Sequence, residues 1–284
     1  MDKNETNKLK YKIIFSDLDQ TLLVNNHIPD FNLEAINKAR NLGVKFVIST
    51  GREFNVMSHL LKELKTDESE NEYTICGSGC KIYENKNKKL IYIKSIPLDI
   101  IKQLFEFGKK YKEIFLLLDT VEGPYIYNPI IFEKEKNVKD SNYNLKYKKF
   151  ETWDEIKDIK IIRIIYSCKN LDYLLKIQDD ILKSKICENK VEYYISVNRF
   201  LEFNALNINK GEALKWLCDY LKINLNESIA IGDNYNDESM IKIAGIGACV
   251  KSANDDIKKI SKYVCEKDYF EGSVKEVIEK FILN

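Results

Sequence analysis

Short apolar runs alternate with amphipathic segments in the first part of the chain. Residues 11–18 form a run rich in β-branched and aromatic residues, which is typical of a strand buried on both faces. A helical pattern follows at 32–42, where apolar side chains recur every three or four positions, and Gly43 stands where a C-terminal cap belongs. Residues 44–50 form a second apolar run. A strand, a helix and a strand in this order predict two parallel strands joined by a right-handed crossover, the beginning of an α/β sheet.

The order of the elements changes between about residue 81 and residue 204. Helical patterns near 98–111 and 170–184 are separated by closely spaced apolar or alternating runs. These runs predict strands at 80–85, 89–96, 114–120, 125–129, 161–167, 191–197 and 199–205. Such a mixed order predicts an α+β insert with a largely antiparallel sheet.

Strands and helices alternate again after this insert. The patterns predict helices at 210–222, 236–243, 253–261 and 272–282, and strands at 227–233, 246–250 and 262–266. With a helix at 53–65 and a strand at 73–76, they complete a single α/β domain. We therefore expect a core domain of residues 1–83 and 205–284, interrupted by a second domain of residues 84–204.

Composition narrows the classes of protein that fit this pattern. A chain of 284 residues with 44% hydrophobic residues can bury a substantial core. The net charge of +1, from 45 basic and 44 acidic residues, gives no general attraction to nucleic acids or anionic lipids. No apolar stretch has the length of a membrane span, and the first ten residues lack the apolar region of a secretory signal. We expect a cytoplasmic monomer or weak homodimer without nucleic-acid or membrane partners.

The cysteines point to neither a disulfide framework nor a zinc site. The chain has seven of them, an odd number, scattered without a CxxC pair, and only two histidines. We interpret the cysteines as reduced thiols.

Polar clusters follow three of the predicted core strands. Residues 17–21 follow the first strand, 49–52 follow the second, and 232–237 follow the strand at 227–233. Lys210 begins a predicted helix. Ligands of open α/β sheets bind beyond the carboxyl ends of the strands, so these clusters mark a candidate site.

Each cluster also has a purely structural interpretation. Asp17 and Asp19 could form a turn or a helix cap, Thr50 could cap the next helix, and the acidic residues of 233–237 could cap the helix that follows. Lys210, taken alone, would be a solvated surface lysine. Their joint placement at one edge of the sheet favours a functional site.

The residue types indicate which chemistry this site carries out. Carboxylates that converge on one edge raise each other's pKa unless a cation lies among them. Hard oxygen ligands without paired histidines favour Mg²⁺. A magnesium site with hydroxyl, ammonium and backbone donors is suited to phosphoryl transfer, and an aspartate there can attack phosphorus to form an aspartyl-phosphate.

Four stretches resemble the signature motifs of a known family. DLDQTLL, STGR, the lysine of NKGEAL and GDNYNDESM, in this order, are similar to the four motifs of the haloacid dehalogenase (HAD) superfamily. The resemblance is greatest to its Cof-type phosphatases of subclass IIB. The motifs span residues 17–240, and the resemblance implies a Rossmann-like parallel-sheet core with an inserted C2-type cap domain.

The resemblance implies roles for the acidic residues. Asp17 would be the nucleophile and a Mg²⁺ ligand. Asp19 would act as general acid and then general base, and would offer its backbone carbonyl to the metal. Asp233 would be a further Mg²⁺ ligand, and Asp237 would support the site through a water molecule or by orienting Lys210.

The remaining motif residues would bind the phosphoryl group. By the same resemblance, Thr50 and Gly51 of the second motif and Lys210 of the third hold the transferring group. Asn236 of the fourth motif would donate a hydrogen bond to it.

The insert would close over the site and contact the leaving group, as a C2-type cap does. Arg163 and Asp119 are candidate substrate contacts, together with Tyr125 and Glu202. Each has a structural alternative, which is pairing on a sheet face for Arg163 and sheet packing for Tyr125.

Two positions depart from the family pattern. Gln20 stands where relatives usually have glycine; if its φ is positive, Gln costs about 1 kcal/mol or more there, and we expect reduced or altered activity. Residues 76–80, CGSGC, replace an Asn-Gly-Ala sequence, and we interpret Gly77 and Gly79 as hinge and turn residues.

The sequence therefore predicts a Mg²⁺-dependent phosphatase that hydrolyses small phosphomonoesters, such as sugar phosphates or related metabolites. Two alternatives remain. A mutase of the phosphomannomutase type would return the phosphoryl group to the substrate, and a non-catalytic regulator would bind a metabolite without turnover.

Overall fold

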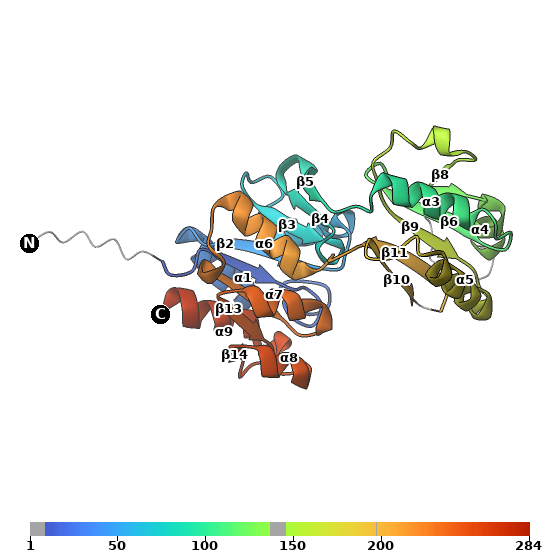
Figure 1. Cartoon of the computed structure of the whole chain (residues 1–284). Helices are drawn as coiled ribbons and strands as arrows, with labels where there is room; N and C mark the ends of the chain where they lie inside the picture. The colour runs from blue at the N-terminus through green and yellow to red at the C-terminus, as the bar shows by residue number, and fades with distance from the viewer. Residues whose placement is uncertain (1–8, 137–145, 197) are drawn as a thin grey trace, which may run out of the picture. The chain divides into compact units, whose positions relative to one another are not determined.

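The computed structural model describes residues 9–136, 146–196 and 198–284. The chain divides into two compact units, Met1–Ile93 with Ile208–Asn284, and Lys94–Asn207 (Figure 1). The first unit is the core domain, and the second is the insert.

The core domain is built on an eight-stranded sheet in the order β14-β13-β12-β1-β2-β3-β4-β5. Strands β14 to β3 run parallel, and β4 and β5 are antiparallel to their neighbours. The strands are β1 Ile13–Ser16, β2 Lys45–Ser49, β3 Tyr73–Cys76, β4 Lys81–Glu84, β5 Lys89–Ile93, β12 Ser228–Gly232, β13 Ile246–Cys249 and β14 Tyr263–Val264. All residues of β1 and β12 are buried, as expected for central strands of a sheet covered on both faces.

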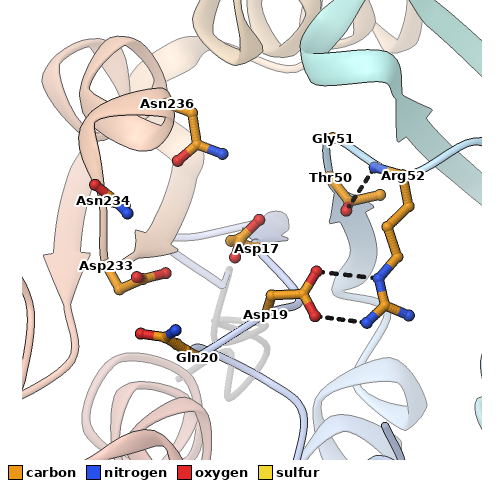
Figure 2. A pocket seen from close by; sticks show the side chains of 9 residues that line it. All are labelled: Asp17, Asp19, Gln20, Thr50, Gly51, Arg52, Asp233, Asn234 and Asn236. Carbon is orange, nitrogen blue, oxygen red and sulfur yellow. Dashed lines mark hydrogen bonds and ion pairs between the residues drawn. The ribbon is translucent and has the colours of Figure 1, made fainter. Parts of the chain in front are cut away.

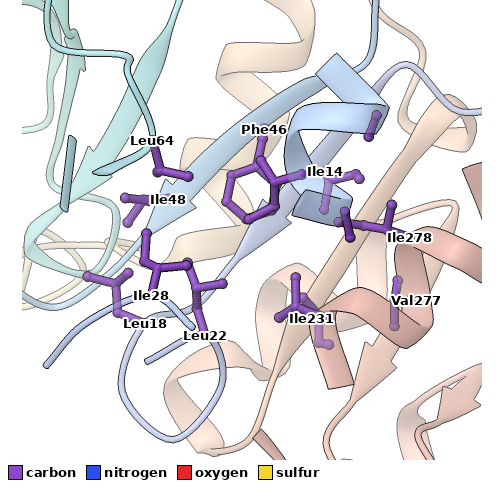
Figure 3. Close-up of a cluster of buried hydrophobic side chains, with 14 of the residues drawn as sticks. Ile14, Leu18, Leu22, Ile28, Phe46, Ile48, Leu64, Ile231, Val277 and Ile278 are labelled. Atoms are coloured by element: carbon purple, nitrogen blue, oxygen red, sulfur yellow. The ribbon is translucent and has the colours of Figure 1, made fainter. Parts of the chain in front are cut away.

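Helices cover both faces of this sheet. On one face α1, α2 and α9 pack against Ile14, Phe46 and Ile231 (Figure 3). On the other face α6, α7 and α8 pack against the alternate strand residues, including Phe15 and Val47. The helices are α1 Asp30–Asn41, α2 Ser58–Glu63, α6 Lys210–Leu221, α7 Glu238–Ile243, α8 Asp255–Ile260 and α9 Ser273–Ile278. The α/β class with a parallel-sheet core is thus confirmed.

The first domain boundary lies ten residues later than 83/84. The predicted boundary fell at the end of β4 and placed β5 in the insert, but β4 pairs with β3 and β5 pairs with β4. A 3₁₀ turn at Gly77–Gly79 reverses the chain directly after β3, so a hairpin forms on the edge of the core sheet. The second boundary follows Asn207 instead of residue 204.

The insert contains a six-stranded sheet in the order β10-β11-β9-β6-β7-β8. Its pairs are antiparallel except for β7 with β8. The strands are β6 Phe115–Thr120, β7 Tyr125–Tyr127, β8 Lys148–Lys149, β9 Ile161–Ser167, β10 Val191–Ser196 and β11 Phe200–Ala205. This arrangement agrees with the predicted largely antiparallel α+β domain; residue 197, at the end of a predicted strand, lies outside the described residues.

Three helices accompany this sheet. Helices α3 Leu98–Gly108 and α5 Leu171–Ser184 correspond to the two predicted helical segments. The expected strand at 125–129 was too long, because Pro129 begins helix α4, Pro129–Lys136. Proline suits the first position of a helix, where its missing N–H has no intrahelical partner. Phe132 of α4 packs against Phe115 and Ile126 of the sheet.

Within residues 9–136, 146–196 and 198–284, no helix combines the length and apolar character of a membrane-spanning segment.

Candidate active site

Three loops surround one cavity at the carboxyl edge of the core sheet. The loops follow β1, β2 and β12, which are adjacent parallel strands with Ser16 paired to both Ile48 and Ile231. The residues that follow these positions therefore converge. The cavity has a volume of about 310 Å³ and is lined by Asp17, Asp19, Gln20, Thr50, Gly51, Arg52, Asp233, Asn234 and Asn236 (Figure 2).

Lys210 lies behind Asp17 and does not line the cavity. Its side chain is fully buried, so it is not a solvated surface lysine. The Nζ donates to Asp17 Oδ1 and, over 2.5 Å, to Asp237 Oδ1. Burial alone would lower the pKa of the ammonium, but the two carboxylates outweigh it and raise the pKa, so Lys210 stays charged.

A glycine brings Lys210 to this position. Lys210 is the first residue of α6, whose cap Asn209 accepts a hydrogen bond from Glu212 N at 2.8 Å. Gly79, with φ +102°, packs directly on this cap: a Cβ there would lie 2.2 Å from the Asn209 carbonyl oxygen. The turn after β3 thus sets how closely the start of α6 approaches the sheet edge.

Asp237 orients Lys210 and shapes the loop after β12. Its Oδ2 accepts hydrogen bonds from the backbone N of Asp233 at 3.0 Å and of Asn234 at 3.2 Å, while its Oδ1 accepts from Lys210. Gly232 permits this, since a Cβ there would lie 2.4 Å from Asp237 Cγ. Because both oxygens already have donors, Asp237 is poorly placed to be a direct metal ligand.

Asp17 and Asp233 form the buried acidic pair of the site. Oxygens of Asp17, Asp233 and Asp237 lie within 4.8 Å of one another, and Figure 2 shows Asp233 directed toward Asp17. Burial is the main cause that raises the pKa of Asp17 to about 7 and that of Asp233 to about 6. Two buried carboxylates whose ionised forms are destabilised in this way are favourable ligands for a cation.

The oxygen atoms available at this position fit a hard divalent cation. Asp233 Oδ1 accepts from Thr21 Oγ1 at 2.9 Å, and Asp17 Oδ1 accepts from Lys210. In the described part of the chain, no donor reaches the Oδ2 atoms of Asp17 and Asp233 or the carbonyl of Asp19, whereas the Leu18 carbonyl accepts from three backbone N–H groups. Two carboxylate oxygens and one carbonyl are ligands that Mg²⁺ prefers, with water completing its coordination.

Hydrogen-bond donors line the other walls of the cavity. Thr50 Oγ1 accepts from Arg52 N at 3.1 Å, which leaves the hydroxyl proton to be donated. Gly51 follows it on the same wall, and Asn236 extends from the loop after β12 (Figure 2). These three residues are therefore placed to contact an anion in the cavity.

Two residues without an assigned role complete the site. Arg52 holds Asp19 through two hydrogen bonds, Nε to Oδ2 at 3.0 Å and Nη2 to Oδ1 at 2.5 Å. Thr21 is the partner of Asp233 described above. Both stand within the motifs, Thr21 two positions after Asp19 and Arg52 two positions after Thr50, but their contacts depend on tertiary geometry.

Gln20 has a φ of 59° and lines the cavity. Because this φ is positive, glutamine is unfavourable at position 20, as the sequence analysis anticipated.

The cap-domain candidates divide into two groups. Arg163 pairs with Asp119 Oδ2 at 3.3 Å and with Glu202 Oε2 at 2.9 Å on one face of the sheet. Tyr125 pairs in register with Leu118 and so lies on the opposite face, where its hydroxyl contacts Glu122 at 3.2 Å. The structure thus brings Arg163, Asp119 and Glu202 together but not Tyr125.

Comparisons with known proteins agree with this geometry. A family model described as haloacid dehalogenase-like hydrolase matches residues 14–278. The 5-amino-6-(5-phospho-D-ribitylamino)uracil phosphatase YcsE of Bacillus subtilis is 27% identical over 267 residues, which cover 94% of each chain.

Solved structures show the same similarity. A haloacid dehalogenase-like hydrolase from Bacteroides thetaiotaomicron has a TM-score of 0.70 and 25% identity, covering 95% of this chain and 99% of that one. The HAD subclass IIB sugar phosphatase BT4131 has a TM-score of 0.65 and 21% identity, covering 95% and 98%. Because BT4131 is only 21% identical to this chain, its similarity shows a shared fold.

Proposed function

Because the chain belongs to the haloacid dehalogenase-like hydrolase family and is a phosphatase that hydrolyses phosphoric monoesters, we propose that it uses Mg²⁺ and an aspartyl-phosphate intermediate. The observation that carries this proposal is the buried pair of Asp17 and Asp233 beside the charged Lys210. A cation would compensate the two carboxylates, and Asp17 would then have one oxygen near the metal and one held by Lys210.

The proposed reaction has two steps. Asp17 attacks phosphorus, the bond from phosphorus to the leaving oxygen breaks, and Asp19 gives that oxygen its proton. Asp19 then takes a proton from water, which attacks the same phosphorus, so that phosphate leaves and the Asp17 carboxylate is restored. Mg²⁺, held by Asp17, Asp233 and the Asp19 carbonyl, would neutralise charge between the nucleophile and the phosphoryl oxygens.

Four residues are proposed to bind the phosphoryl group. Thr50 offers a hydroxyl proton, Gly51 a backbone N–H, and Asn236 a side-chain amide. Lys210 does not line the cavity, and two of its three N–H donors are used on Asp17 and Asp237; the third would serve a phosphoryl oxygen that binds directly beside Asp17.

The substrate proposed is a small phosphorylated metabolite, such as a sugar phosphate. The names of the relatives support this class, since one is a phosphatase of a phosphoribitylamino compound and another a sugar phosphatase. We propose that Arg163 and Asp119 of the cap contact the leaving group. An altered order of preference among substrates in Arg163→Ala would support this role. The absence of a nucleic-acid partner and a monomeric or weakly dimeric state stay predictions.

A phosphate-release screen tests the proposal. Sugar phosphates, nucleotides, pyridoxal phosphate and flavin mononucleotide are compared with and without Mg²⁺, beside an Asp17→Ala control. We expect release that requires both Mg²⁺ and Asp17. Isomerised substrate without free phosphate would indicate the mutase alternative, and affinity without turnover would indicate the regulator. Hydrolysis that survives Asp17→Ala would exclude the aspartyl-phosphate mechanism.

A further inference from the structure

The guanidinium group of Arg52 uses three nitrogen atoms in one hydrogen-bond network. Nε and Nη2 donate to the two oxygens of Asp19, and Nη1 donates to Asn26 Oδ1 at 2.7 Å. Figure 2 shows the two planar groups of Asp19 and Arg52 side by side at the cavity wall. A lysine could not form this arrangement, because its ammonium is a single charge without the planar pair of donors.

Asn26 is itself fixed. It lies in a tight turn closed by a bridge between Val24 and His27, with φ values of 50° at Asn25 and 62° at Asn26. His59 of α2 contacts the Asn26 carbonyl through Nε2 at 3.1 Å. The turn therefore holds Nη1 of Arg52, while Nε and Nη2 bind Asp19.

The Asp19–Arg52 pair lies at the surface of the cavity. The Asp19 side chain is 59% exposed, so water screens the charges of the pair and reduces what it contributes to the stability of the fold. Arg40 offers a comparison: its Nε and Nη2 donate to Glu72 at 3.3 and 2.8 Å, and its Nη1 donates to the Leu64 carbonyl at 2.7 Å. That pair is more buried and lies away from the cavity.

We infer that Arg52, held by Asn26, is a positioning residue that orients Asp19 for the second step, in which Asp19 takes a proton from water. The inference rests on the proposed function. A carboxylate has about four lone-pair sites, and Arg52 occupies two of them, one on each oxygen. The other two remain for water while both bonds to Arg52 stay intact.

The test uses p-nitrophenyl phosphate, whose leaving group departs readily without a proton. In Arg52→Ala the first step stays fast and the second slows, so a burst of p-nitrophenolate should precede a steady state. The burst should approach one equivalent per active site. A misplaced catalytic group commonly costs about a hundredfold, so we expect kcat to fall tenfold to a hundredfold, with recovery of part of the loss in Arg52→Lys.

Two further variants distinguish an effect on Asp19 from a general loss of stability. Asn26→Ala leaves the Asp19–Arg52 pair intact and should lower kcat in the same direction by a smaller factor, with a smaller burst. Arg40→Ala removes the matching pair outside the cavity and should lower the melting temperature without a burst.

Three results would overturn the inference: a loss of kcat without a burst, a rise in KM alone, or a burst of equal size in Arg40→Ala. Absence of phosphate release by the unaltered protein would instead refute the proposed function, so the two failures are distinguishable.

Discussion

Gln20 has a backbone conformation that its side chain disfavours. At a φ of 59° the Cβ of an L-residue approaches the following carbonyl, which glycine avoids. Since the residue lines the cavity, the strain lies within the candidate site.

Gln20→Gly should therefore raise the free energy of unfolding by about 1 kcal/mol, measured by denaturant titration. The control is Gln103→Gly in helix α3, where the same substitution should lower it by about 1 kcal/mol. Destabilisation by both substitutions would show that Gln20 is not strained.

Mg²⁺ affinity should depend on pH through the two buried carboxylates. The pKa of Asp17 is raised to about 7 and that of Asp233 to about 6, so protons compete with the metal below these values. The association constant measured by calorimetry should be constant above pH 8, fall about tenfold per pH unit below 7, and fall more steeply below 6. An association constant unchanged between pH 8 and pH 5.5 would exclude these ligands.

Motif spacing identifies some residues of the site and not others. Asp17, Asp19, Lys210 and Asp233 stand in recognisable motifs, and all are found at one sheet edge. The pairing of Arg52 with Asp19 joins two loops that are separate in the sequence, so no local pattern predicts it. The burial of Lys210 likewise depends on packing of α6 against the turn after β3.

At the level of elements, the sequence pattern misplaced the first domain boundary and missed the start of helix α4. An alternating strand has the same pattern at the edge of the core sheet as in the insert, so β5 was assigned to the wrong domain. Helix α4 was missed because its first residue, Pro129, also fits the end of a strand.

The turn after β3 supports the start of α6. In Gly79→Ala the added Cβ meets the Asn209 carbonyl and the φ is unfavourable, so we expect a loss of about 2–4 kcal/mol in unfolding free energy. We also expect lower turnover, because displacement of α6 moves Lys210.

Gly43→Ala is the matched control. Gly43 has a φ of +91° with nothing within 4 Å of an added Cβ. The Gly43→Ala substitution should lower the free energy of unfolding by about 1–2 kcal/mol, because alanine disfavours a positive φ, and it should leave turnover unchanged. Equal effects of the two substitutions on turnover would contradict the role given to the Gly79 contact.

For the whole molecule, the order of strands and helices along the chain predicted a core domain divided by an insert. The core has its own sheet, covered on both faces by helices with separate hydrophobic clusters. The residues of the candidate metal site all belong to it.

The core domain should therefore fold without the insert. A chain in which residues 95–206 are replaced by a short Gly-Ser linker should unfold cooperatively and bind Mg²⁺ within about threefold of the affinity of the full chain. Circular dichroism and calorimetry measure the two properties. A cooperative fold that does not bind Mg²⁺ would contradict the ligand set.

Trapping the covalent intermediate tests the central claim most directly. The protein is mixed with a hydrolysed phosphomonoester and Mg²⁺, quenched in acid within one turnover, digested and analysed by mass spectrometry. We predict one phosphoryl group on the peptide that carries Asp17, absent without Mg²⁺ and absent in Asp17→Asn. Rapid hydrolysis with the phosphoryl group on another residue, or with none on the protein, would contradict the account.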